Sequence, residues 1–84
     1  MVLDYIPHTL AAVTQFPGVA QTKLTELVWG TSGRGNPRLI NLFNYMVRDG
    51  LLTRTQRGRS ITYTTTQKGD ELLAQKPVDY KFEW

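Results

Sequence analysis

Residues 36–65 read NPRLINLFNYMVRDGLLTRTQRGRSITYTT, and this stretch predicts a helix followed by a β-hairpin. Asn36 and Pro37 form a helix start, because asparagine caps helix N-termini and proline is favoured at the first helical position. Apolar residues then recur at helical spacing, and we expect the helix to stop at Gly50. Beyond the glycine, two alternating segments rich in threonine turn back across residues 57–59, which is the pattern of a hairpin.

The positive charge of the chain is concentrated in the same region. All six arginines lie between Arg34 and Arg59 with Asp49 as the one acid among them, so this segment carries a charge of +5. The rest of the chain holds four lysines against six acids, which leaves +3 for the whole protein. Basic side chains gathered on a helix and a neighbouring hairpin are the electrostatic footprint of a nucleic-acid-binding protein.

Length and composition are those of one small globular domain. The chain has 84 residues, of which 40% are hydrophobic and 20% charged, enough for a single small core. It has no cysteine, which excludes disulfides and thiolate metal sites. No apolar run reaches the roughly 20 residues that a membrane-spanning helix needs. The N-terminus also lacks the pattern of a signal peptide, so we expect a cytoplasmic protein without membrane association.

Groups that could support catalysis are scarce. His8 is the only histidine, and it stands beside Pro7 with no acid or nucleophile at a recognisable spacing. Asp70 and Glu71 fit the first turn of a helix, where carboxylates complement the helix dipole, better than they fit a metal site. We therefore expect no enzymatic activity, no metal and no cofactor.

Further helices are expected on both sides of the helix–hairpin stretch. An apolar stripe predicts a first amphipathic helix, which residues 16–18 end. A second helix is predicted from about residue 20 to residue 29, and Thr66 is expected to cap a last short helix over residues 67–74. The stripe of the first helix consists of Leu3, Ile6, Leu10 and Val13.

The helix that begins at Asn36 has two faces of different chemistry. At about 100° per residue, one side is apolar and is expected to face the core. It carries Leu39, Leu42, Phe43 and Met46. The other side has no acid and offers amide, phenol and guanidinium groups, which read base edges and contact phosphates. It carries Asn41, Asn44, Tyr45 and Arg48, with Arg38 at its flank.

Two segments resemble parts of known transcriptional regulators. Residues 46–52, MVRDGLL, look like the end of a recognition helix entering the wing in MarR-like and PadR-like regulators. Residues 63–73, YTTTQKGDELL, are similar to the pattern that closes the wing in those families, although the families usually have leucine where Thr65 stands. The resemblance implies a winged helix-turn-helix, an α+β fold with three helices, a two-stranded wing and a short C-terminal helix.

A DNA-binding surface made of the helix and the wing follows from the resemblance. Two arginines around a glycine, as at residues 57–59, can enter a narrow minor groove with little steric obstruction, although charged hairpin tips also serve solubility. The expected DNA-binding residues are Arg34, Asn36, Arg38, Asn41, Asn44, Tyr45, Arg48, Arg54, Arg57 and Arg59.

The last eight residues form an apolar tail. We place them, as residues 77–84, outside a winged-helix domain of residues 1–76. Large apolar residues alternate with charged ones in the tail, which predicts a strand. They are Val78, Tyr80, Phe82 and Trp84. We expect this face to pack on its own domain or on a second copy, ahead of a foreign partner.

The sequence favours a sequence-specific duplex DNA-binding protein, a transcriptional regulator that acts as a homodimer. Its recognition helix would occupy the major groove, and its wing would contact the minor groove or phosphates. One alternative is a winged-helix module that docks a partner protein through Tyr80, Phe82 and Trp84. Another is an accessory protein on plasmid or phage DNA. Repressor, activator and accessory roles, the target sequence and any effector are left open.

Overall fold

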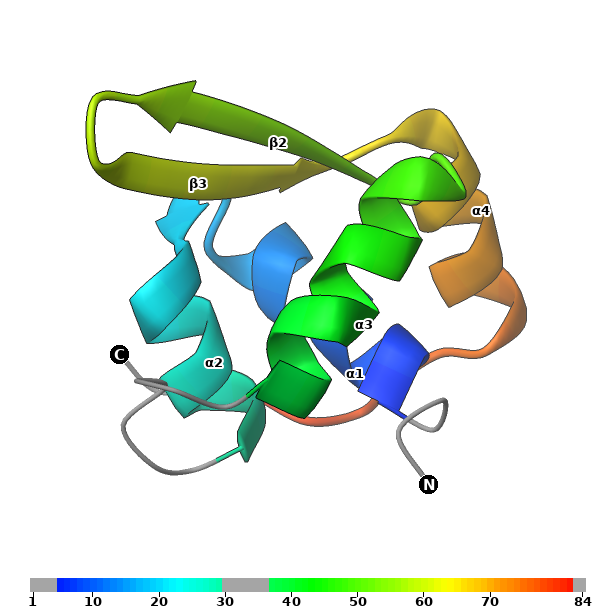
Figure 1. Ribbon diagram of the computed structural model, residues 1–84. Helices are drawn as coiled ribbons and strands as arrows, with labels where there is room; N and C mark the ends of the chain where they lie inside the picture. Colours follow the sequence, from blue (N-terminus) through cyan, green and yellow to red (C-terminus); the bar gives the residue numbers. More distant parts are fainter. Residues whose placement is uncertain (1–4, 30–36, 83–84) are drawn as a thin grey trace.

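The computed structural model describes residues 5–29 and 37–82 (Figure 1). Within these ranges the chain is an α+β domain of four helices and a three-stranded antiparallel sheet, and no helix is long and apolar enough to cross a membrane. The α+β class predicted from the sequence is confirmed. The elements are α1 (Tyr5–Gln15), β1 (Val19–Ala20), α2 (Gln21–Trp29), α3 (Pro37–Arg48), β2 (Leu52–Arg57), β3 (Ser60–Thr65) and α4 (Gln67–Gln75).

Helix α1 lies at the centre of the core and packs against α2, α4 and β3. Leu10 and Val13 are fully buried and Ile6 is half-buried, as the predicted apolar stripe requires. Leu3, the first residue of that stripe, lies outside the described residues. Because α2, α4 and β3 all pack against α1, the stripe buries its apolar side chains on several elements. In Figure 1, α1 lies behind α3 and beneath the sheet.

Strand β1 makes the sheet larger than the two-stranded wing expected from the sequence. The strand order is β1-β3-β2, with Val19 paired to Tyr63 and Ala20 to Thr62. The chain reaches this position through Gly18, which has a φ of 78° and donates its backbone N–H to the Tyr63 carbonyl at 3.0 Å. A strand of two residues has no alternation to display in the sequence, so it forms only because β3 offers it a partner.

Helix α3 has the two faces that the sequence predicts, and its apolar side is buried. The buried side chains are Leu39, Leu42, Phe43 and Met46. The helix ends at a Schellman motif, in which Gly50 N–H donates to Val47 O at 3.1 Å. The next amide, Leu51 N–H, donates to Met46 O at 2.8 Å. Gly50 supplies the positive φ of 80° that this motif needs, so the predicted glycine stop is confirmed and the chain passes directly into β2.

Strands β2 and β3 form the predicted hairpin, which crosses over the helices and extends beyond them at its tip (Figure 1). The ladder closes with the pair Arg57 and Ser60, so Gly58 and Arg59 make a two-residue loop. Gly58 has a φ of 59°, which suits glycine at the first loop position of a type II′ turn. The side chain of Tyr63 in β3 is fully buried and anchors the hairpin on the helices.

Thr66 caps α4, as the sequence predicts. Its Oγ1 accepts a hydrogen bond from Gly69 N–H at 3.1 Å and its hydroxyl donates to the carbonyl of Gly50. Gly69 lies against the connection between α3 and β2, where a Cβ atom would overlap the carbonyl oxygen of Leu51 and approach Cδ2 of Leu10 to 3.0 Å. The first turn of α4 can therefore pack this closely only because residue 69 has no side chain.

The tail is not a strand over its described residues, 77–82, so that prediction is wrong. Its backbone is bound instead by Gln15 of α1. The Gln15 amide nitrogen donates to Tyr80 O at 2.7 Å and the amide oxygen accepts from Phe82 N–H at 2.8 Å. One glutamine side chain thus satisfies backbone groups that a neighbouring strand would otherwise satisfy. Trp84 lies outside the described residues.

Phe82 also corrects the expectation that the tail stays outside the core. Its side chain is only 4% exposed, and its ring centroid lies 4.7 Å from that of His8 on α1. Tyr80 packs on the same two rings but keeps 55% of its surface exposed. The described tail therefore packs on its own domain, because a phenylalanine ring gains more from burial there than from exposure to water.

Candidate nucleic-acid interface

The outer face of α3 presents a set of exposed polar side chains with no carboxylate among them. The exposed residues are Arg38, Asn41, Asn44, Tyr45 and Arg48, all of which the sequence placed at a DNA-binding surface. Four of them project from the side of α3 opposite its buried apolar residues, and Arg38 lies at the flank of that side. Amides, a phenol and guanidinium groups on one helix face can donate to phosphate oxygens and to base edges.

The single acid of the arginine-rich segment is paired. The Asp49 carboxylate lies 3.6 Å from Nζ of Lys68 on α4, and the same ammonium donates to the Asp49 backbone carbonyl at 2.8 Å. The charge of Asp49 at the C-terminal end of α3 is thereby offset locally. The exposed surface next to Arg48 keeps its positive character.

The predicted hairpin residues divide between the two faces of the sheet. Arg57 is exposed on the outer face, while Arg54, three residues earlier, points to the inner face toward α3, because side chains alternate along a strand. Arg59 is exposed in the loop. Arg57 and Arg59 therefore stay together at the tip, and Arg54 belongs to a separate cluster at the junction between the hairpin and α3.

At that junction, four polar side chains from four elements form a hydrogen-bonded series. Gln21 begins α2, and its Oε1 accepts a hydrogen bond from the Tyr63 hydroxyl at 2.7 Å. The Tyr63 oxygen accepts from Nε of Arg54 at 3.3 Å. Arg54 also donates from Nη2 to Oδ1 of Asn44 on α3. These three hydrogen bonds connect α2, both strands of the hairpin and α3 through one continuous series of side chains.

Tyr63 stays protonated in this arrangement. Burial of the phenol raises its pKa above the ordinary value, although the hydrogen bond and the positive charge of Arg54 act in the opposite direction. The guanidinium carbon of Arg54 lies 5.6 Å from the centroid of the Tyr63 ring, close enough for a cation–π contact. A protonated Tyr63 gives its only hydrogen to Gln21 and leaves its oxygen to accept from Arg54.

Gln21 and the hydroxyl of Tyr63 cannot be assigned to this site from the sequence alone. Gln21 and Tyr63 are 42 residues apart, and no local pattern links them. Tyr63 lies in a segment that the sequence predicts only as part of the hairpin. Arg34 and Asn36, two further expected DNA-binding residues, lie outside the described residues.

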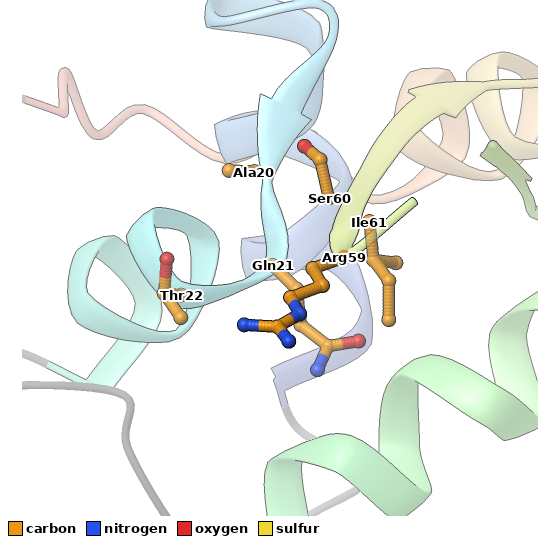
Figure 2. Close-up of a pocket in the computed structure, with 6 residues that line it drawn as sticks. All are labelled: Ala20, Gln21, Thr22, Arg59, Ser60 and Ile61. Carbon is orange, nitrogen blue, oxygen red and sulfur yellow. The ribbon is translucent and has the colours of Figure 1, made fainter. Parts of the chain in front are cut away.

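A shallow pocket lies between the start of α2 and the hairpin tip (Figure 2). Its volume is about 250 Å³. The lining residues are Ala20, Gln21, Thr22, Arg59, Ser60 and Ile61. Figure 2 shows the Arg59 side chain extending toward the start of α2. The lining provides hydroxyl, amide and guanidinium groups and no carboxylate, a combination that suits an anionic group such as a backbone phosphate.

No protein-family model matches the sequence, and comparison with curated proteins finds no similar chain.

Proposed function

We propose that this protein is a winged helix-turn-helix protein that binds duplex DNA, with α3 as the recognition helix and the β2–β3 hairpin as the wing. The order of elements supports this assignment, because the hairpin follows α3 directly and β1 completes a small sheet beside it. An exposed helix can enter the major groove of B-DNA, which is about 12 Å wide.

The observation that carries the proposal is the chemistry of the outer face of α3. Its exposed residues are amides, a tyrosine and arginines, and the helix has no acid over Pro37–Arg48. A face that served solubility alone would more commonly mix acids with lysines. Arg57 and Arg59 add two positive charges at the hairpin tip, where they can contact phosphates or the minor groove.

Affinity and sequence choice come from different contacts in this mechanism. Neutralisation of phosphates by arginines supplies most of the affinity, whereas a few contacts to base edges from α3 supply the preference for a site. We propose that the protein acts as a cytoplasmic homodimer on two half-sites about one helical turn apart and regulates transcription by occupying its site. An accessory role on plasmid or phage DNA would use the same surface.

Docking of a partner protein through the tail is less well supported. Phe82, one of the three tail residues that such docking would use, is buried against α1. A docking surface needs exposed apolar anchors, and the exposed large apolar side chains among the described residues are Tyr45 and Tyr80. These two tyrosines come from different elements, α3 and the tail.

Titration of the purified protein with random-sequence duplex DNA at about 50 and 200 mM salt tests the proposal. We expect log Kd to rise with log salt with a slope of several units, at roughly 0.9 for each phosphate neutralised. Fluorescence anisotropy of a labelled duplex measures this directly. Absence of binding at the lower salt concentration would rule out the DNA-binding function, and binding without salt dependence would rule out the proposed phosphate contacts.

A further inference from the structure

Asn44 and Arg54 form one hydrogen-bonded unit at the edge of the proposed DNA-binding face. Asn44 is exposed on α3, and its Oδ1 accepts from Nη2 of the half-buried Arg54 on β2. Arg54 is held in place from behind, since its Nε donates to the Tyr63 hydroxyl, which is in turn bound to Gln21. The orientation of the Asn44 amide is therefore set by the hairpin and not by its own helix.

This contact turns the acceptor of the unit toward Arg54. An asparagine amide has one acceptor atom, Oδ1, which carries two lone pairs, and one donor group, the Nδ2 amino group, whereas arginine has donors only. Because the guanidinium uses one lone pair of Oδ1 and places its positive charge beside the other, the favoured contact of a ligand is with Nδ2. The unit therefore presents N–H donors to a ligand. A ligand N–H group that approached Oδ1 would also be repelled by the positive charge of Arg54.

Asn41 provides a contrast on the same helix face. It lies three residues before Asn44 and is likewise exposed. Within the described residues, no hydrogen bond is seen from its side chain. Its amide can therefore present both Oδ1 and Nδ2 to a ligand, as the bidentate contact of asparagine with adenine requires.

We infer that the Asn44–Arg54 unit is a specificity determinant that selects guanine over adenine at the base pair it faces in the major groove. Guanine presents two acceptors there, N7 and O6, which match a surface made of donors. Adenine presents N7 but replaces the second acceptor with the N6 amino group, which would be placed against other donors. Tyr63 acts as a positioning residue for this unit. The inference rests on the DNA-binding function proposed above and specifies one of its contacts.

Site selection from a library of randomised duplexes with the full chain and three single variants tests the inference. We expect the unaltered protein to prefer guanine over adenine roughly tenfold at one position of its site, and Asn44→Ala to abolish that preference. Arg54→Ala should affect the same position as Asn44→Ala. The matched control Asn41→Ala should leave the guanine preference at that position intact. Competition with duplexes carrying each of the four base pairs at this position gives the fold-changes.

Tyr63→Phe separates positioning from folding, because it keeps the ring in the core and removes only the hydroxyl. We expect it to reduce the guanine preference while the salt slope of binding stays unchanged, since the number of phosphates neutralised stays the same. A purely structural role would instead weaken binding to every sequence equally, and that result would overturn the positioning role. Thermal melting identifies any variant that fails to fold, and Asn44→Ala, at an exposed position, then decides the inference.

Three outcomes overturn the inference while leaving the proposed function standing. One is a preference for adenine at the position that Asn44→Ala relaxes. Another is an unchanged set of preferences in Asn44→Ala. The third is that Arg54→Ala and Asn44→Ala relax different positions. Failure of the unaltered chain to bind any duplex would instead overturn the DNA-binding function, and the inference with it.

Discussion

The ring of Phe82, near the C-terminus, lies 4.7 Å from the ring of His8 on α1, centroid to centroid, at an interplanar angle of 61°. This edge-to-face contact is typical of favourable ring pairs. Together with the two hydrogen bonds between the Gln15 side chain and the tail backbone, it holds the C-terminal segment against the first helix. The stability of the whole domain should therefore depend on residues at both ends of the chain.

Replacement of Phe82 by alanine should lower the free energy of unfolding by about 3 kcal/mol, because a buried ring is removed and a cavity is left. Tyr80→Ala is the matched control, since Tyr80 comes from the same tail but is 55% exposed. Its substitution should cost less than about 1 kcal/mol. Urea denaturation measures both values. Equally small losses for the two variants would contradict the packing of Phe82 in the core.

The stability of the domain should fall as the solution becomes acidic, partly because of His8. Burial lowers the pKa of His8 below the ordinary value of 6.5, so the unfolded chain binds a proton at a higher pH than the folded domain does. The contribution of neutral His8 to stability is then complete above about pH 6.5 and is lost as the pH falls toward the folded-state pKa.

His8→Phe keeps a ring at this position and removes the titrating group. Thermal melting of both proteins between about pH 7.5 and 5 should show the unaltered chain losing stability relative to the variant below about pH 6.5. A constant difference between the two melting temperatures across this range would contradict the linkage.

Arg57 and Arg59 should contribute to DNA binding through their position and not only through net charge. Replacing both with alanine should reduce the salt slope by up to about two units, at roughly 0.9 for each phosphate that is no longer neutralised. The control is Lys76→Ala with Lys81→Ala, which lowers the net charge of +3 by the same amount at exposed residues that belong to neither the hairpin nor α3. If both double variants lower the slope equally, the hairpin tip makes no specific phosphate contact.

Gly69 should be intolerant of alanine although it lies within a helix. Gly→Ala usually stabilises a helix interior by roughly 0.5–1 kcal/mol. Here the added Cβ would overlap the Leu51 carbonyl, so we expect a net loss of about 1–3 kcal/mol from overpacking. Ala74→Gly, at an exposed position of the same helix, should also destabilise the domain. Denaturation of the two variants tests the sign, and a more stable Gly69→Ala protein would show that α4 can move away from Leu51.

The local elements could be predicted from the sequence because short-range interactions determine them. Proline begins α3, Gly50 ends it, and Gly58 turns the hairpin, each through a backbone conformation that its residue type favours. Periodicity likewise identified the buried face of α3 and, by exclusion, the exposed residues proposed to contact DNA. The α+β class follows from the order of these elements.

Contacts between distant segments were decided only by the tertiary structure. β1 exists because β3 pairs with it, and the tail packs on α1 because Gln15 and His8 lie where Phe82 can reach them. An alternating apolar pattern is compatible both with a strand and with an irregular segment that packs on the domain. The pattern of the tail alone therefore led to the wrong prediction of a strand. The link from Asn44 to Arg54 has the same origin. Each residue was identified as polar and available for DNA, but their hydrogen bond depends on how the hairpin packs against α3, which no local pattern encodes.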